Sequence, residues 1–171
     1  MRRKDREKDR EFGLEVIDNT DYGVMTLKKN AYSIPLTFSR DGENLYFHCA
    51  KVGEKIDYIE DGDSVRIVFV SQSQTPIGHT PERVRELLKS GEISLSKVFT
   101  IGYKSAIVEG RIYRVEDEKE KVHSLRILSE RLVPNMMEFF EQAIERSIKI
   151  TGVYKIELDQ IESKCKEVPK I

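Results

Sequence analysis

The sequence carries almost no net charge and contains no long apolar run. Its 29 basic and 30 acidic side chains leave a formal charge of −1 and a pI of about 6.4. Such a balance gives no domain-wide attraction for nucleic acid or an anionic membrane, so any anion binding must be local. No stretch approaches the ~18 apolar residues that span a bilayer, and the basic residues 1–7 lead into no signal-peptide pattern. We therefore expect a soluble, cytoplasmic protein without nucleic-acid or membrane partners.

Cysteine is also scarce, and the common catalytic motifs are missing. Cys49 and Cys165 form no CxxC pair and no Cys/His cluster, so we expect neither a disulfide framework nor a metal site. The sequence contains no Walker A loop, GxGxxG, GxSxG or HExxH motif. These absences favour a protein of a reducing compartment whose chemistry does not follow one of those templates.

The chain is long enough, at 171 residues, for one compact domain with a core. Hairpin signals dominate its first half, and Asp41-Gly42 is the strongest because both residues tolerate positive φ. Strands are expected at 22–27, 32–39, 45–50, 64–70, 98–115 and 152–158, and helices at 5–19, 51–60, 81–89, 116–131 and 134–147, with a loop at 71–76. We predict a mainly β (α+β) fold: an antiparallel barrel with peripheral helices, as one domain over 1–171. It has a helical insertion near 77–91 and a helical pair near 117–147.

A candidate anion site lies at residues 46–57, where a buried strand is expected to run directly into a helix. The first N–H groups of a helix lack internal partners and the helix dipole is positive there, so a phosphate suits this junction. Lys51 and Lys55 are four residues apart and share a face of the expected helix. An ordinary solvated basic face gives the same pattern, and the residues alone favour that reading.

Two further segments have the character of ligand contacts. Pro35 interrupts a β pattern and cannot donate a ladder hydrogen bond, which indicates an edge, a bulge or a ligand-facing position. Tyr103, Lys104 and Ser105 follow Gly102 and bring hydroxyl and ammonium donors to an otherwise apolar strand, where they suit a phosphate. A plain edge strand and an exposed strand start explain these segments equally well.

Histidine gives little evidence for catalysis. His48 lies within a core-like strand, where a structural role is the commoner one, and no histidine pair has metal-ligand spacing. Neighbours on a strand point to opposite faces, so His48 is not expected to activate Cys49 as a nucleophile. His79 is expected in a loop and His123 on a helix.

The order of these segments resembles the FMN-binding split-barrel family related to pyridoxamine 5′-phosphate oxidase, and most closely its nitroimidazole-resistance (Nim) branch. The resemblance rests on residues 1–7, 34–38, 45–50 with Gly53 and Lys55, 103–107, and Ser163 with Lys164. The stretch 76–97 is longer than the corresponding family loop, and Glu54 stands where the oxidase branch has an arginine. The basic C-terminal motif of the true oxidases is missing, so vitamin-B6 oxidation is not expected.

The resemblance implies a homodimer with FMN at the subunit interface. Pro35, Leu36, Thr37 and Phe38 would lie along the isoalloxazine ring and meet it largely through their backbone. The pocket would be lined by His48, Cys49 and Ala50, with Lys51 beside them, and Lys55 would meet the phosphate. Tyr103, Lys104 and Ser105 would approach the phosphate end, with the partner subunit as one source of these residues.

Three functional hypotheses follow. The first is an FMN-dependent oxidoreductase that reduces nitroaromatic or quinone-like acceptors, in which the flavin carries the hydride or electron chemistry and His48 is the best candidate for a substrate contact. The second is a non-catalytic flavin- or haem-binding module, where a haem would use His48 or His79 as its ligand. The third is a dimeric structural partner with a vestigial pocket.

Overall fold

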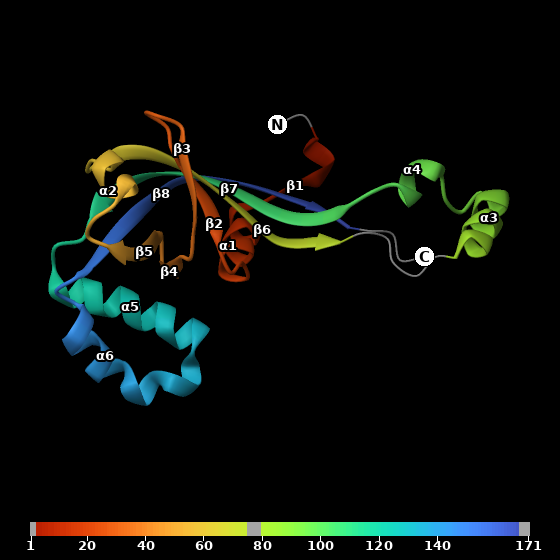
Figure 1. Ribbon diagram of the computed structural model, residues 1–171. Helices are drawn as coiled ribbons and strands as arrows, with labels where there is room; N and C mark the ends of the chain where they lie inside the picture. The colour runs from red at the N-terminus through yellow and green to blue at the C-terminus, as the bar shows by residue number, and fades with distance from the viewer. Residues whose placement is uncertain (1–2, 75–79, 168–171) are drawn as a thin grey trace.

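The described part of the chain forms one antiparallel sheet. The computed structural model describes residues 3–74 and 80–167. Within them, eight strands pair in the order β3-β2-β6-β7-β8-β5-β4, and the short β1 pairs with β8. The strands are β1 Glu7–Lys8, β2 Gly23–Leu27, β3 Tyr32–Leu36, β4 Ser39–Asp41, β5 Asn44–Ala50, β6 Asp63–Gln74, β7 Gly102–Arg114 and β8 Thr151–Lys166. The sheet curls into a half-barrel (Figure 1), which confirms the predicted split-barrel fold.

The helices lie beside the sheet and at its two ends (Figure 1). They are η1 Lys4–Arg6, α1 Arg10–Asp18, α2 Glu54–Tyr58, α3 Pro81–Ser90, α4 Leu95–Val98, α5 Glu118–Leu132, η2 Pro134–Phe139 and α6 Phe140–Ser147, where η denotes a 3₁₀ helix. Helix α1 packs against β6, β7 and β8, whereas α5 packs against β4 and β5. The sheet therefore has a helix on each side but is covered by neither over its full width.

The core lies on the concave side of the sheet, where alternate residues of the strands meet. Phe69 on β6 is 1% exposed, and its ring meets Phe38 edge-on at 5.5 Å. Phe38 also contacts Phe47 of β5 at 5.9 Å, so it joins strands from the two halves of the sheet. This inward turn of Phe38 divides the single strand expected at 32–39 into β3 and β4.

Helix α1 is shorter than the sequence predicted. The expected start near residue 5 is wrong, because Asp9 caps the helix by accepting a hydrogen bond from the Phe12 N–H at 2.9 Å. The residues before Asp9 form η1 and β1 instead. Gly13 lies where α1 crosses β8, and a Cβ there would overlap Ile161, so the helix comes closer to the sheet than another residue would allow.

Three strands end at other residues than predicted. β8 runs for 16 residues, well beyond the expected end at 158, and β6 continues to Gln74 through the expected loop. In contrast, β7 begins only at Gly102, since 98 belongs to α4. The extended parts are polar, and the ladder with a neighbouring strand, rather than an apolar pattern, keeps them in the sheet.

The β6–β7 ribbon carries α3 and α4 away from the barrel (Figure 1). The predicted α3 is confirmed: the Thr80 hydroxyl caps it, Pro81 occupies its first turn, and Gly91 ends it with φ of 77°. Residues 75–79, which include His79 and the start of the expected insertion, lie outside the described residues.

The helical pair near 117–147 is present, with two differences. Asp117 caps α5, whose Ser124 and Leu128 are buried, but Leu132 at its end is 48% exposed although its spacing predicted burial. The helix expected from Pro134 starts as the 3₁₀ segment η2 and becomes α-helical only at Phe140. Tyr46 of β5 donates a hydrogen bond to Glu120 at 3.0 Å, which fixes α5 to the convex side of the sheet.

Candidate functional site

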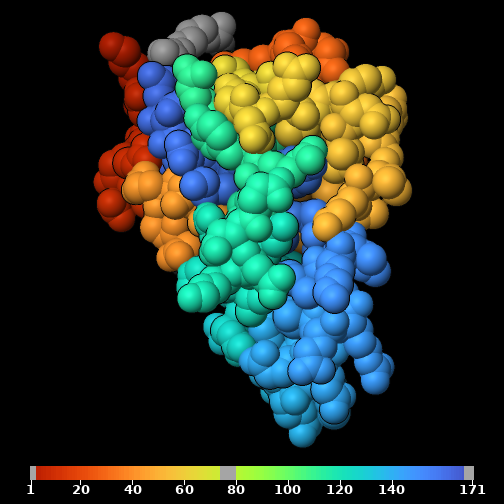
Figure 2. Space-filling model, turned by 90° about the vertical axis from the view of Figure 1, so that its left-hand side faces the viewer, coloured from red at the N-terminus to blue at the C-terminus, as the bar shows by residue number. Residues whose placement is uncertain are grey.

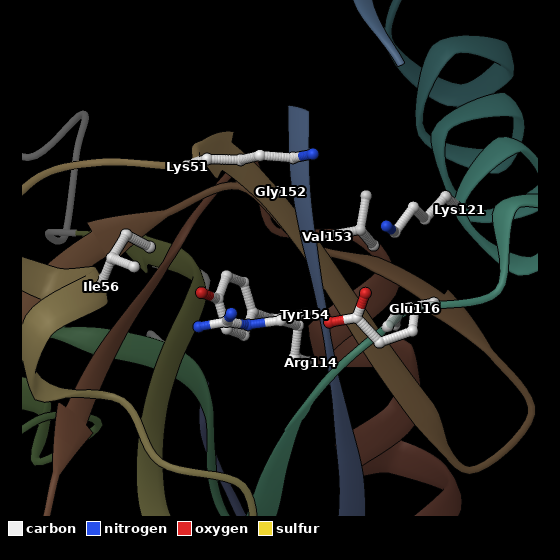
Figure 3. A pocket seen from close by; sticks show the side chains of 9 residues that line it. Lys51, Ile56, Arg114, Glu116, Lys121, Gly152, Val153 and Tyr154 are labelled. Carbon is white, nitrogen blue, oxygen red and sulfur yellow. The ribbon is translucent and has the colours of Figure 1, made fainter. Parts of the chain in front are cut away.

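A cavity of about 290 Å³ opens at one end of the barrel. Figure 2 views the molecule from this side, where the chain segments coloured yellow, green and blue meet. Five elements converge there: the end of β5, α2, the end of β7, the start of α5 and the start of β8. The cavity is lined by Lys51, Ile56, Arg114, Val115, Glu116, Lys121, Gly152, Val153 and Tyr154 (Figure 3).

Tyr154 supplies an aromatic wall. It is 2% exposed and stacks on Phe47, with the ring centroids 5.1 Å apart and the planes 11° from parallel. The Arg114 guanidinium lies 5.8 Å from the centre of the Tyr154 ring, and the two residues are paired in register on β7 and β8. Burial raises the pKa of Tyr154 despite the opposing charge of Arg114, so the hydroxyl is neutral at physiological pH.

The charge of the cavity is positive. Lys51, Arg114 and Lys121 come from three different elements (Figure 3), and Glu116 is the single acidic residue in the lining. Lys51 is held in place by a hydrogen bond of 2.6 Å from its Nζ to the carbonyl of Lys149. Three cations against one carboxylate suit an anionic group such as a phosphate.

Helix α2 differs from the helix on which the phosphate prediction rested. It contains five residues, Glu54–Tyr58, so Lys51 lies outside it and the expected shared face of Lys51 and Lys55 is wrong. Gly53, with φ of 121°, makes the turn that delays the helix start. A helix this short, with two acidic residues in its first turn, offers little dipole to an anion. The charge at this junction comes from side chains.

His48, Cys49 and Ala50 end β5 next to the cavity. They pair with Val153, Gly152 and Thr151 of β8, and two of these partners line the cavity. Cys49 packs against the core while His48 is exposed, which confirms that they face opposite ways. Partial burial lowers the pKa of His48, and the nearby charge of Lys55 lowers it further. Burial raises the pKa of the Cys49 thiol, against the opposite influence of Lys55 and Arg114.

The residues predicted along a flavin ring lie on the other edge of the sheet. Pro35 and Leu36 belong to β3, and β3 is an edge strand, as the proline predicted. Thr37 follows the strand half-buried, and the Phe38 side chain is in the core. Helix α2 connects the two edges, because Tyr58 meets Tyr32 of β3 edge-on at 5.2 Å.

Tyr103, Lys104 and Ser105 are not near the cavity in the same chain. They pair with Lys166, Cys165 and Lys164 at the far end of β8. Gly152, at the other end of β8, lines the cavity. Thirteen residues separate Gly152 from Cys165, and at ~3.3 Å per residue the two sites lie about 40 Å apart along the strand. In its own chain, Tyr103 accepts a hydrogen bond from Arg6 at 3.4 Å, and Lys104 lies 5.8 Å from the Phe12 ring.

The sequence did not single out Arg114, Tyr154 or Lys121. In the sequence, Lys121 lies among other charged residues of an expected helix, and Arg114 and Tyr154 lie within expected strands. The available signal was weak: a cation at the end of each of two strands, Lys51 after β5 and Arg114 at the end of β7. Only the pairing of both strands with β8 places these cations together.

Residues 3–74 and 80–167 contain no cluster of three histidine, cysteine or acidic side chains that could hold a metal. No helix among them is long and apolar enough to cross a membrane.

Known structures share this fold. A proposed 5-nitroimidazole antibiotic resistance protein from Bacteroides thetaiotaomicron is 19% identical, with a TM-score of 0.62 over 94% of this chain and 89% of its own. The FAD and heme binding protein from Mycobacterium smegmatis is 14% identical, with a TM-score of 0.72 over 95% and 74%. A proposed pyridoxamine 5′-phosphate oxidase from Corynebacterium glutamicum is 10% identical, with a TM-score of 0.55 over 96% and 94%. The fold of the chain is therefore the split barrel of pyridoxamine 5′-phosphate oxidase-like proteins.

No protein-family model matches the sequence, and no curated protein matches it. At these low identities the structural likeness shows the fold alone.

Proposed function

We propose that this chain is an FMN-dependent oxidoreductase, built as a single flavin-binding domain that pairs into a homodimer. The observation that carries the proposal is the cavity that Lys51, Arg114 and Lys121 line together with the buried ring of Tyr154. An aromatic wall with a cationic rim suits a planar ligand that bears a phosphate. Structures of similar fold support a flavin, since one of them is named as an FAD and heme binding protein.

The residues of the cavity fit the cofactor in defined roles. Arg114 and Lys51 would hold the phosphate, with Lys121 beside them, and Lys55 would add its charge from α2. A cavity of about 290 Å³ is at the lower limit for such ligands, so the ring system would extend beyond it. The part of the ring system outside the cavity would contact the end of β5, from His48 to Ala50, and the β3 edge, from Pro35 to Phe38.

When bound, the flavin supplies the hydride or electron transfer. The chain would orient the ring, exclude water from the wall formed by Tyr154 and Val153, and present the exposed His48 imidazole to a substrate. Its lowered pKa keeps His48 neutral at physiological pH, so it would act as a polar contact rather than a charge. A nitroaromatic or quinone-like acceptor is the proposed substrate class.

An apolar row on the convex side of the sheet supports the homodimer. Val24 of β2 lies beside Val68 of β6, and both are exposed, as is Val70 two residues further along β6. Exposed β-branched residues at adjacent positions are typical of a covered interface. A second copy on this face would also provide a source of Tyr103, Lys104 and Ser105, which lie far from the cavity in their own chain. The two free cysteines support a reducing cytoplasm as the site of action.

The test is FMN retention with a phosphate-specific control. The purified protein is mixed with FMN, desalted and examined by visible absorption, and affinity is then titrated by flavin fluorescence. We expect wild-type protein to retain flavin and Arg114→Met to bind FMN at least tenfold more weakly. Arg111→Met is the matched control, because Arg111 lies on the same strand and is exposed like Arg114 but does not line the cavity.

Riboflavin separates the phosphate contact from the rest of the site. It lacks the phosphate, so Arg114→Met should leave its affinity within twofold of wild type. Equal loss of both ligands would show that Arg114 does not meet the phosphate. A protein that retains neither flavin after desalting would overturn the flavoenzyme proposal.

A haem-binding module is the second candidate. One observation favours it: His48 is exposed and pairs in register with Val153, which lines the cavity, and its neutral imidazole is available as a ligand. Haem addition would then give a Soret band that His48→Ala removes and His123→Ala leaves unchanged. A band that persists in His48→Ala would exclude this ligand.

A further inference from the structure

The arm, residues 80–101, is an element separate from the barrel. It contains α3 and α4 and sits at the far end of the β6–β7 ribbon (Figure 1). Lys166 at the end of β8 donates a hydrogen bond to the Thr100 hydroxyl, which ties the base of the arm to the sheet. Leu87 is 3% exposed and its carbonyl accepts hydrogen bonds from the N–H groups of Glu92 and Ile93. These two bonds close the C-terminal end of α3.

Three large apolar side chains of the arm are exposed. Phe99 is 84% exposed, Leu95 is 59% and Ile101 is 53%. Single exposed apolar residues are common, but three within seven positions on a projecting element are typical of a surface that another molecule covers. In Figure 1 the arm projects away from the barrel, so α3 and α4 lie apart from the other labelled elements.

A second apolar patch lies on the helical pair at the opposite end of the molecule (Figure 1). It follows the end of α5 into η2 and consists of Leu132, Val133, Met136 and Phe139, each about half exposed, at 48 to 57%. The barrel separates this patch from the arm, so one chain cannot bring its own two patches together.

The charges around the two patches have opposite sign. Residues 80–101 carry four basic and three acidic side chains, whereas residues 130–145 carry one basic and four acidic. Within the arm, Glu82 and Glu86 pair with Arg85 and Arg83, so its net charge stays at +1, and on the helical pair Glu141 pairs with Arg126. Electrostatic complementarity of this kind orients partners and favours their encounter.

We propose that the arm of one copy docks on the helical pair of a second copy. A twofold axis makes the contact twice, because each chain contributes an arm and a helical pair. The apolar row of β6 leads toward the arm, so the contact extends the interface of the proposed homodimer, on which this inference rests. The partner is thus a second copy of this chain. The contact between the arm and the helical pair adds to the contact between the two sheets.

Cysteine cross-linking between differently labelled copies tests the contact. In a Cys49→Ser, Cys165→Ser background, one preparation carries Phe99→Cys and a second, size-tagged preparation carries Met136→Cys. Mild oxidation of the mixture should give a mixed disulfide dimer in larger yield than either preparation gives alone. Val52→Cys, at 79% also exposed but outside both patches and the apolar row of β2 and β6, replaces Phe99→Cys as the control for random collision. A mixed yield no higher than this control would overturn the proposal.

Dimer affinity gives an independent measurement that also separates this inference from the proposed function. By sedimentation, Phe99→Ser should weaken self-association at least tenfold, and the double change with Met136→Ser should lose less than the sum of the single changes. Phe99 is exposed, so its replacement leaves the folded chain intact. A dimer of unchanged affinity would overturn the arm contact and leave the homodimer in place. FMN retention is measured on the same samples, so failure of the flavin proposal is recognised separately.

Discussion

The barrel and the arm are connected by the same pair of strands but differ in how far they bury their apolar side chains. On β6, Phe69 is 1% exposed within the core, whereas Phe99, past the end of the ribbon, is 84% exposed. The ladder between β6 and β7 continues from one region into the other. Backbone pairing therefore extends a strand without creating a core, and a core forms only where further strands and a helix cover the side chains.

The same difference determines where a site can form. At the barrel end, β5, β7 and β8 lie side by side, and Lys51 and Arg114, at the ends of β5 and β7, line one cavity with Tyr154. At the arm end, charged residues such as Arg83 and Glu86 pair with each other in solvent. At the barrel end, several charged side chains can therefore act on one ligand. At the arm end, apolar surface stays available for a partner.

The largest expected effect compares the two phenylalanines. Phe69→Ala removes a buried ring and leaves a cavity, so the free energy of unfolding should fall by about 3–5 kcal/mol. Phe99→Ala should change it by less than about 0.5 kcal/mol, because an exposed ring gains little from folding of its own chain. Urea denaturation at protein concentrations that keep the chain monomeric measures both. Equal losses would show that the arm ring is buried within its own chain.

A smaller effect compares two glycines of the barrel. A Cβ on Gly110 would overlap the carbonyl oxygen of Glu157 at the β7–β8 bulge, whereas at Gly152, beside the cavity, the nearest atom is 3.5 Å away. Gly110→Ala should therefore cost about 2–3 kcal/mol, since the backbone must shift. Gly152→Ala should remain within about 1 kcal/mol. Thermal unfolding of the pair checks this, and a tolerated Gly110→Ala would contradict the close strand contact.

The next effect compares two acidic side chains. Burial opposes the charge of Glu109, but hydrogen bonds from Lys28 and Arg66 outweigh it and lower the pKa of the carboxyl. Glu109→Gln should cost about 1 kcal/mol at neutral pH, allowing for solvent screening. The exposed Glu82 of the arm also pairs with an arginine, and Glu82→Gln should have no measurable effect.

The pH dependence of this contribution has a definite sign. Because folding lowers the pKa of Glu109 below 4.5, its stabilisation is present above that pH and is lost as the pH falls through the lower value. Wild type should therefore lose more stability than Glu109→Gln during acid titration. Parallel curves for the two proteins would contradict the assignment.

The smallest expected effect concerns His48. Its pKa should lie below 6.5 by NMR titration, and Lys55→Met should raise it without restoring the full value, because burial is the larger cause. The folded state then binds fewer protons than the unfolded chain, so stability falls as the pH drops from about 6.5 through the lower pKa. Lys97→Met on the arm is the matched control and should leave His48 unchanged. An unshifted His48 in Lys55→Met would show that the lysine is too distant to act.

Local chemistry predicted some elements well. Asp41-Gly42 gave the turn between β4 and β5, with Gly42 at φ of 56°, and Thr80, Pro81 and Gly91 marked both ends of α3. Turn and cap residues act within four or five positions, so the sequence states their effect directly. Pro35 likewise indicated an edge strand, because a residue without an N–H cannot pair on both sides.

The site was predictable only in part. Lys51, one of the predicted cofactor residues, lines the cavity, but its partners Arg114 and Tyr154 come from strands more than sixty residues away. The helix expected to carry the phosphate starts three residues late, at Glu54, because Gly53 adopts a positive φ. Whether Pro35–Phe38 and Tyr103–Ser105 contact a flavin stays a prediction.

The sequence by itself determined the balance of strands and helices, the turns, the caps and the alternation that turns His48 and Cys49 to opposite faces. The tertiary structure decided how far β6 and β8 extend, which cations gather around Tyr154, and which apolar side chains stay exposed on the arm. The physical reason is the distance along the chain over which each effect acts. Backbone preference and side-chain period act between near neighbours, whereas register, burial and the field of several charges depend on residues that only the folded sheet brings together.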